Sequence, residues 1–275
     1  EIHAITGAPF SIPALARRTK QTGSRSFAVS VPDPDFCPYY SASLLEEVRW
    51  GETPDFMKRR LEICGIRCIN FIVDVTNYVL LEWGQPLHAF DADRLRGARI
   101  EARRAHAQEK MTAIDGKSYE FVRDDLVIAD ERGAVAIGGI MGGRNSEVLE
   151  GAKNILLESA FFSPVQIRST RKRLGLESES SYRFERRVDP EGVDQARERA
   201  VDLIAKYARV ERIRKPFQAG KLPIRRSRIS LGRAQIKKTL GLEVPPSKTK
   251  ELLGRLGLRL SERAGRFHVE VASVR

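Results

Sequence analysis

Two polar side chains stand out in this sequence because each lies inside an otherwise apolar stretch. His88 lies in "GQPLHAFD" (residues 84–91), and Glu158 lies in "NILLESAFF" (residues 154–162). Burying a carboxylate without a partner costs several kcal/mol, so Glu158 either lies on a solvated strand face or has a specific partner. His88 is either a hydrogen-bonded structural imidazole or a chemical group in a pocket. The residues alone leave these alternatives open.

Four glycines lie close together in "IGGIMGG", residues 137–143. Such a run forms either two tight turns where backbones pack closely, or a pocket wall of bare backbone whose N–H groups approach a substrate oxygen. The sequence has no GxGxxG followed by a helix, no GKS/T loop, no GxSxG and no HExxH. These absences argue against dinucleotide-binding, P-loop, α/β-hydrolase and zincin sites.

The positive charge of the chain is concentrated in one stretch. The net charge is +12, and residues 161–240 contain 21 Lys and Arg against 9 Asp and Glu. Within this stretch, residues 168–190 also carry hydroxyl groups and the aromatic rings of Tyr182 and Phe184. Basic groups with interleaved aromatics suit a phosphate backbone and an unstacked base, whereas the alternative is a solvated charged surface. Composition does not decide between them.

Helices are predicted where caps and apolar spacing agree. Thr53 as N-cap and Gly65 at the end indicate one helix. In "FIVDVTNYVLLEWG" (residues 71–84), the β-branched start predicts a buried strand, and the stretch from Thr76 to Glu82 predicts a helix. Two further helices are predicted at residues 163–175 and 189–208.

Short apolar runs predict strands in the middle of the chain. Asp115-Gly116 and "DERG" (residues 130–133) separate such runs and suit hairpin turns. Mixed or antiparallel sheets with flanking helices follow, which is an α+β fold. The three cysteines are an odd count at irregular spacing, which favours a reducing compartment over a disulfide framework. No apolar run approaches the ~20 residues that span a bilayer.

Proline, glycine and charge mark the domain boundaries. Residues 1–26 are interpreted as the linker or tail of a preceding domain, residues 27–214 as the main domain and residues 215–226 as a linker. Residues 227–275 contain two short predicted helices, each capped by a serine, and then a hairpin. That order predicts a small winged-helix-like α+β domain, truncated at its C-terminus.

Several segments together resemble the beta subunit of bacterial-type phenylalanyl-tRNA synthetases. They are "GIRCINFIVDVTNYVLLEWGQPLHAFD", "AIGGIMGG", "NILLESAFF" and "LGLESESSYRFERRVDP", in the order of the family. The resemblance implies an editing domain of the B3/B4 type over residues 27–214 and a B5-type domain over residues 227–275. Family members usually have glycine where this chain has Arg187, which raises the question of a positive φ there.

The resemblance implies that this region hydrolyses mischarged tyrosyl-tRNA(Phe), while the amino-acid activation site lies in the partner alpha subunit. An apolar pocket for phenylalanine discriminates only ~100-fold against tyrosine, which carries one added hydroxyl. A second pocket that hydrogen-bonds this hydroxyl therefore improves the discrimination between the two amino acids. Glu158 matches the tyrosine-selecting carboxylate, and His88 is expected to orient the ester or the attacking water. Gly138 and Gly139 are expected to supply backbone contacts. The expected substrate-binding residues are Thr76, Asn77, Pro86 and Arg67.

The resemblance also implies partners: tRNA(Phe), an alpha subunit in a heterotetramer of two alpha and two beta chains, and tyrosine as editing ligand. We expect no cofactor or metal in this region, with ATP and Mg²⁺ serving the full ligase, and a cytoplasmic location without membrane or DNA. One alternative is a non-catalytic RNA-binding and assembly module with an inactive pocket. Another is a DNA-binding protein, although "SKTKELLGRLG" offers no Asn or Gln to read bases.

Overall fold

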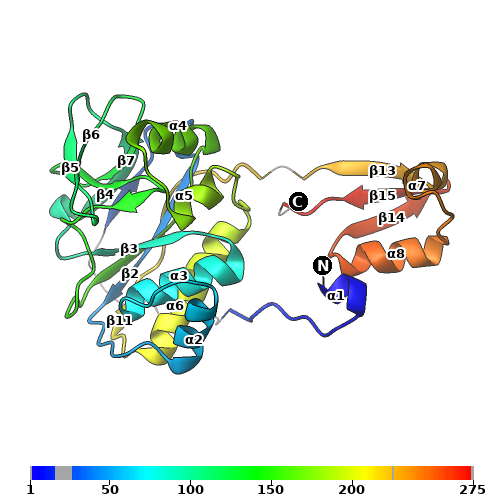
Figure 1. The fold of residues 1–275 in the computed structure, drawn as a ribbon, viewed down its shortest axis with the longest axis horizontal. Coiled ribbons are helices and arrows are strands. Elements are labelled where there is room, and N and C mark those ends of the chain that lie inside the picture. The colour runs from blue at the N-terminus through cyan, green and yellow to red at the C-terminus, as the bar shows by residue number, and fades with distance from the viewer. Residues whose placement is uncertain (1, 16–26, 225, 274–275) are drawn as a thin grey trace. The chain divides into compact units, whose positions relative to one another are not determined.

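The computed structural model describes residues 2–15, 27–224 and 226–273 (Figure 1). The chain divides into two units, one of Leu15–Pro223 and one made from both ends of the sequence, Glu1–Ala14 and Ile224–Arg275. Both units combine helices with mixed or antiparallel sheets, so the fold class is α+β, as predicted. Of the predicted tail, residues 16–26 lie outside the described residues.

A sheet with the order β11-β2-β10-β3 runs through the middle of the Leu15–Pro223 unit, and β12 also pairs with β2. Every residue of β2 (Tyr39–Glu46) and β10 (Ile155–Phe161) is buried, so both faces of this central sheet are covered. Strand β3 (Leu87–Asp91) is antiparallel to β10. The other strands are β11 (Arg212–Ile213) and β12 (Phe217–Gly220), of which β12 lies within the predicted linker.

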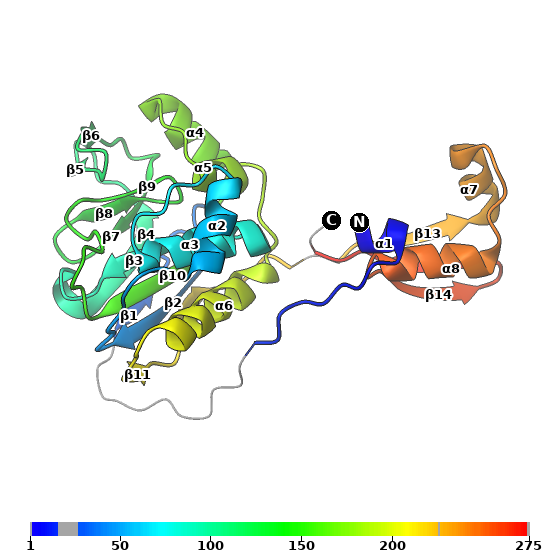
Figure 2. The same cartoon turned by 60° about the horizontal axis from the view of Figure 1, so that its bottom comes forward.

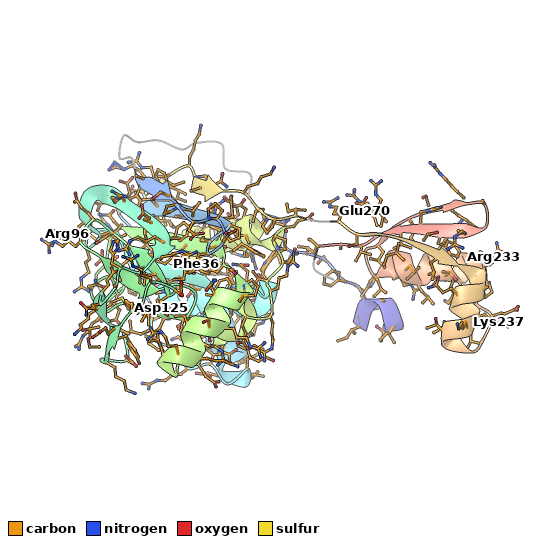
Figure 3. The ribbon with its side chains drawn as sticks, turned by 90° about the horizontal axis from the view of Figure 1, so that it is seen from above. Phe36, Arg96, Asp125, Arg233, Lys237 and Glu270 are labelled. Carbon is orange, nitrogen blue, oxygen red and sulfur yellow. The ribbon has the colours of Figure 1, made fainter. Side chains whose placement is uncertain are left out.

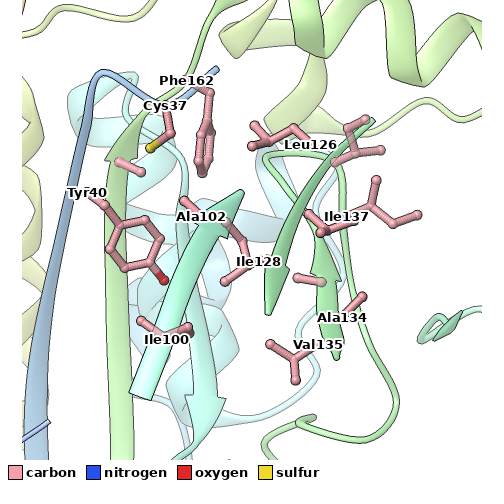
Figure 4. Packing of buried hydrophobic residues seen from close by; sticks show 14 of the residues in the cluster. Cys37, Tyr40, Ile100, Ala102, Leu126, Ile128, Ala134, Val135, Ile137 and Phe162 are labelled. Atoms are coloured by element: carbon pink, nitrogen blue, oxygen red, sulfur yellow. The ribbon is translucent and has the colours of Figure 1, made fainter. Parts of the chain in front are cut away.

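One face of the central sheet packs against a second sheet of order β1-β4-β7-β8-β9. Figure 4 shows Tyr40 of the central sheet beside Ile100 and Ala102 of β4 in the shared core. The strands of the second sheet are β1 (Ala28–Ser30), β4 (Arg99–Arg104), β7 (Leu126–Ala129), β8 (Ala134–Ile137) and β9 (Met141–Gly142). The predicted hairpins are confirmed, one between β7 and β8 and one between β5 (Lys110–Thr112) and β6 (Ser118–Glu120).

The opposite face of the central sheet is covered by helices α2 (Asp55–Ile63), α3 (Phe71–Trp83) and α6 (Gly192–Tyr207), as Figures 1 and 2 show. The apolar side chains of α6 recur at helical spacing, and its Ala196, Ala200 and Ile204 are buried in this second core. The remaining helical segments of this unit are η1 (Arg96–Ala98), α4 (Pro164–Leu174) and α5 (Glu179–Phe184).

Two sequence-based predictions about the first helices were wrong. Residues 71–75 are not a strand, because α3 begins at Phe71, where the side chain of Asn70 caps it by accepting a hydrogen bond from the N–H of Val73 at 3.0 Å. The β-branched residues enter the helix because tertiary packing overrides weak local propensity. Thr53 does not cap α2, and its hydroxyl instead donates to the buried Asp74 carboxylate at 2.5 Å.

The smaller unit contains the predicted order of two helices and a hairpin. Its core includes Ile236 and Phe267. The elements are α1 (Ile2–Thr6), β13 (Arg228–Gly232), α7 (Arg233–Leu240), α8 (Pro246–Arg255), β14 (Arg259–Arg263) and β15 (Arg266–Glu270). The predicted serine caps are wrong, because Gly232 and Pro245 occupy the N-cap positions. Helix α1, which the sequence did not predict, packs against α8.

Charged side chains cover much of the described surface, as Figure 3 shows for Arg233 and Lys237 of α7. Both form surface ion pairs, Arg233 with Glu262 at 3.4 Å and Lys237 with Glu243 at 2.7 Å. Among the described residues, no helix has the length and apolar character needed to cross a membrane.

Candidate active site

The side chains of His88 and Glu158 lie on the same face of the central sheet. Strands β3 and β10 are antiparallel, and their register places His88 directly opposite Glu158. Directly opposed residues in such a pair have Cβ atoms about 4.5–5.5 Å apart. Both residues line one cavity of about 360 Å³. Sheet pairing thus brings together a carboxylate and an imidazole that are far apart in the sequence.

Four more of the expected site residues line this cavity. Thr76 and Asn77 come from α3, Pro86 from the loop before β3, and Gly139 from the turn between β8 and β9. Sequence reasoning missed other residues of the wall, among them Asn70, Gly142, Ser178 and Ser180. Ser178 and Ser180 lie in the motif "LGLESESSYRFERRVDP", which carried part of the resemblance but was given no role in the site.

Two expected site residues do not line the cavity. Gly138 donates its N–H to the carbonyl of Leu126 at 2.9 Å, and a Cβ on Gly138 would lie 2.6 Å from the Leu126 side chain. Gly138 therefore serves close packing within the second sheet. Arg67 lies in the exposed segment between α2 and α3 and is not among the residues of the cavity wall.

Glu158 is nearly inaccessible, with 6% of its surface exposed, and has a specific partner in the protein. The hydroxyl of Tyr40 donates a hydrogen bond to Oε2 of Glu158 at 2.5 Å. Burial raises the pKa of Glu158 to about 7, and the Tyr40 hydrogen bond acts in the opposite direction. Glu158 therefore titrates near neutral pH instead of near the ordinary pKa of a carboxylate. Tyr40 could not be identified from the sequence, because this partner comes from a distant strand.

His88 is held as a neutral imidazole. The residue as a whole is half-buried, and its Nε2 is buried and has no hydrogen-bond partner within the described parts of the chain. Burial lowers the pKa of His88 to about 4, so the ring carries no charge at neutral pH. A group with this pKa accepts a hydrogen bond but is a weak base. It suits the orientation of a water molecule or ester better than strong proton abstraction.

Gly142 fixes the position of the His88 ring. A Cβ on Gly142 would lie 2.6 Å from Cε1 and 2.9 Å from Nε2 of His88, closer than non-bonded atoms approach. The imidazole therefore packs against bare backbone of β9. Sequence reasoning recognised the glycine-rich run but assigned the functional role to Gly138 and Gly139, because spacing alone does not show which glycine faces the histidine.

Gly139 forms a tight turn at the edge of the cavity. Its φ is 67°, and the N–H of Ile140 donates to the carbonyl of Ile137 at 3.0 Å across the turn. A Cβ on Gly139 would lie within 2.9 Å of side-chain atoms of Ile167, Phe162 and Phe184. Both the backbone conformation and the packing therefore require glycine here.

Local hydrogen bonds position the walls of the cavity. Helix α3 ends at Gly84, whose φ of 70° suits a glycine cap. The side chain of Gln85 then donates to the carbonyl of Ala160 at 3.0 Å, which ties the loop before β3 to β10. On the other side, the hydroxyl of Ser178 donates to the carbonyl of Ile140 at 2.8 Å and ties the start of α5 to the glycine turn.

The basic segment at residues 168–190 is partly neutralised by ion pairs. Arg171 pairs with Glu185 at 2.7 Å, and the guanidinium of Arg186 lies over the ring of Tyr182 at 3.7 Å from its centroid. Arg187 has a φ of 70°, which answers the question raised by the family's glycine at this position. No group of three potential metal ligands occurs among the described residues.

The family model of the B3/4 domain matches residues 36–209. The chain is 38% identical over 274 residues to the phenylalanine–tRNA ligase beta subunit of Syntrophus aciditrophicus, covering 96% of this chain and 33% of that protein. It is 42% identical to the same subunit of Moorella thermoacetica, covering 100% of this chain and 34% of that protein. The chain thus spans about a third of the length of these curated relatives.

A solved structure was also found, an N-terminal fragment of the phenylalanyl-tRNA synthetase beta subunit from Pyrococcus horikoshii. It shares 14% identity, with a TM-score of 0.49, over 94% of this chain and 72% of that one. The B3/4 match over residues 36–209 contains strands β2, β3 and β10 of the central sheet, the cavity, His88 and Glu158. The chain therefore belongs to the B3/4 domain family and is similar, over its length, to the beta subunits of phenylalanine–tRNA ligases.

Proposed function

We propose that the Leu15–Pro223 unit hydrolyses the ester bond of tyrosyl-tRNA(Phe), which removes tyrosine attached in error. The observation that carries this proposal is the pairing of His88 with Glu158 across β3 and β10 at one cavity. The cavity of about 360 Å³ falls in the range of small-molecule sites, which extends from about 300 to 1,000 Å³. One aromatic amino acid attached to a terminal ribose suits such a site.

Glu158 supplies the selectivity in this proposal. Tyrosine and phenylalanine differ by one hydroxyl, and a carboxylate accepts a hydrogen bond from a phenol. Phenylalanine in the same place leaves a desolvated acceptor without a donor, which costs about 1–3 kcal/mol or more for a charged group. The correct aminoacyl-tRNA is therefore a poor substrate, while the mischarged one binds.

The hydrolytic step needs positioning more than a protein nucleophile. The oxygen of a water molecule attacks the carbonyl carbon, the bond between that carbon and the ribose oxygen breaks, and the ribose oxygen takes up a proton. The products are tyrosine and uncharged tRNA. Neutral His88 accepts a hydrogen bond from the water and directs a lone pair at the ester. Holding water and ester in a reactive geometry supplies a large part of such a rate enhancement.

We also propose the context that the similarity to phenylalanine–tRNA ligase beta subunits implies. The chain works in the cytoplasm with an alpha subunit, in an assembly of two alpha and two beta chains, and it binds tRNA(Phe). The alpha subunit performs ATP- and Mg²⁺-dependent aminoacylation. The B3/4 match over residues 36–209 supports the editing role within that assembly.

The test is deacylation of tRNA(Phe) charged with labelled tyrosine, and the reaction is monitored through the release of labelled tyrosine. His88→Ala should slow release about 100-fold, the size of effect that misplacing a reacting group produces. His106→Ala is the matched control, because His106 is exposed and is not part of the cavity wall. Equal rates for the two variants would remove His88 from the mechanism, and no release by the unaltered protein would favour a non-catalytic RNA-binding module.

A further inference from the structure

Tyr40 reaches Glu158 diagonally across two strands of the central sheet. The register of β2 and β10 pairs Glu158 with Ala42 and pairs Tyr40 with Ala160. Residues two apart along a strand share a face, so Tyr40 and Glu158 point to the same side and lie within reach of each other. The small side chains of Ala42 and Ala160, at the two directly opposite positions, leave room for the Tyr40 ring over this face of the sheet.

The Tyr40 ring is fixed in place. Tyr40 has no exposed surface and packs in the core between the two sheets, where Figure 4 shows it near Cys37, Ile100 and Ala102. Its hydroxyl has one proton to donate, and this proton goes to Oε2 of Glu158 at 2.5 Å. Because the Tyr40 ring is packed on all sides, it cannot move with the Glu158 carboxylate when that carboxylate rotates. The hydrogen bond therefore anchors one oxygen of Glu158 to the core.

Because Tyr40 holds Oε2 of Glu158, the other carboxylate oxygen, Oε1, is the one left for a ligand. A carboxylate accepts hydrogen bonds at both oxygens, and Glu158 is part of the cavity wall. We propose that Tyr40 is a specificity-determining positioning residue, which holds Oε2 of Glu158 so that Oε1 accepts the phenol of a tyrosyl ligand. This inference rests on the proposed function, because it concerns how the same cavity selects its substrate.

The electrostatics of the site support this role. Burial disfavours the charged form of Glu158, whereas the Tyr40 hydroxyl favours it by donating a hydrogen bond. A carboxylate acceptor binds a phenol more strongly than a neutral carboxyl group does, since hydrogen bonds to ionised groups are roughly twice as strong. Without the Tyr40 hydroxyl, Glu158 holds its proton more tightly and its orientation is no longer fixed. Both changes weaken the preference for a phenol.

The experiment measures binding of tyrosinamide and phenylalaninamide, which occupy the amino-acid site without being hydrolysed as esters. Tyr40→Phe keeps the ring volume and removes the hydroxyl. The ratio of the two affinities should fall about tenfold or more, the usual effect of losing a hydrogen bond to a charged group. Tyrosinamide binding should account for the change, and phenylalaninamide binding should stay as it is in the unaltered protein.

The neighbouring tyrosine provides a matched control. Tyr39 lies on the same strand and donates to the Asp194 carboxylate at 2.8 Å, but its side chain points to the opposite face of the sheet. Tyr39→Phe therefore removes the same group from the same strand without touching Glu158, and it should leave the affinity ratio unchanged. An unchanged ratio in Tyr40→Phe, or an equal fall in both variants, overturns the inference.

A second measurement needs no variant and covers the case in which Tyr40→Phe does not fold. The buried Tyr40 hydroxyl proton should give a downfield, slowly exchanging NMR signal, and it should move when tyrosinamide binds but not when phenylalaninamide binds. An identical response to both ligands contradicts the inference. If the protein prefers tyrosinamide but does not hydrolyse tyrosyl-tRNA, the proposed hydrolysis fails while the role of Tyr40 stands. If it hydrolyses tyrosyl-tRNA but Tyr40→Phe leaves the affinity ratio unchanged, the role of Tyr40 fails while the proposed hydrolysis stands.

Discussion

The contact between Gly142 and His88 gives a quantitative prediction for Gly142→Ala. The new methyl carbon would lie 2.6 Å from Cε1 of His88. Restoring a normal contact of about 3.6 Å requires the imidazole to move by about 1 Å. A displacement of that size in a reacting group lowers the rate about 100-fold, and overpacking at this position should cost about 1–3 kcal/mol of folding free energy.

Gly138→Ala separates the effect on His88 from the effect on stability. Its methyl carbon would also lie 2.6 Å from a side chain, but that side chain is the core residue Leu126. Gly138 keeps its backbone N–H as alanine, and its φ, like that of Gly142, is not in the positive range. The two variants should therefore lose similar stability, while Gly138→Ala retains hydrolysis.

The assay is single-turnover release of tyrosine from tyrosyl-tRNA(Phe), measured beside urea unfolding of each variant. We expect comparable unfolding midpoints for Gly142→Ala and Gly138→Ala, and a rate about 100 times lower for Gly142→Ala alone. Equal rates at equal stability would refute the reasoning, because they would show that the position of the His88 ring does not limit the reaction.

Two further predictions concern stability. Burial raises the pKa of Glu158 from 4.5 to about 7, so between these values the unfolded chain ionises while the folded protein keeps its proton. The contribution of Glu158 to folding stability should therefore fall by up to about 3 kcal/mol as the pH rises from 4.5 through 7, whereas the lowered pKa of His88 acts in the opposite direction in both proteins. Urea unfolding at pH 4.5 and 8 should show Glu158→Gln gaining about this much stability relative to the unaltered protein at the higher pH. A difference between the two proteins that does not vary with pH would contradict the burial argument. Arg187 has a φ of 70°, so Arg187→Gly should raise the free energy of unfolding by about 1 kcal/mol, whereas Arg187→Ala should give no such gain.

Local signals in the sequence identified the elements whose caps and turns are encoded nearby. The hairpin at Asp115-Gly116 and the buried stripe of α6 are examples. The start of α3 was misread because its β-branched residues favour strands in isolation, and the outcome depends on the Asn70 cap and on packing against the sheet. Propensity alone contains neither of these contributions.

The site was predictable as far as the resemblance extended, and no further. His88 and Glu158 were named from their motifs, and the structure places them opposite each other at one cavity. Tyr40 and Gly142 escaped notice because their importance lies in what they touch across strands. A tyrosine in an alternating strand and one glycine among four have no distinguishing local pattern. The register of the paired strands brings Tyr40 and Gly142 next to the site, and this register cannot be read from the sequence.

The pairing of α1 with α8 has a consequence for the order in which the protein forms. The carbonyl of Ala4 in α1 accepts a hydrogen bond from Arg255 of α8 at 3.5 Å, and the two residues lie near opposite ends of the sequence. During synthesis on the ribosome, α1 emerges before α8 and has no partner until the segment between the two helices has been made. Leu15–Pro223 has its own core and completes its contacts earlier. Of these two units, the larger should therefore complete its core before the smaller one does.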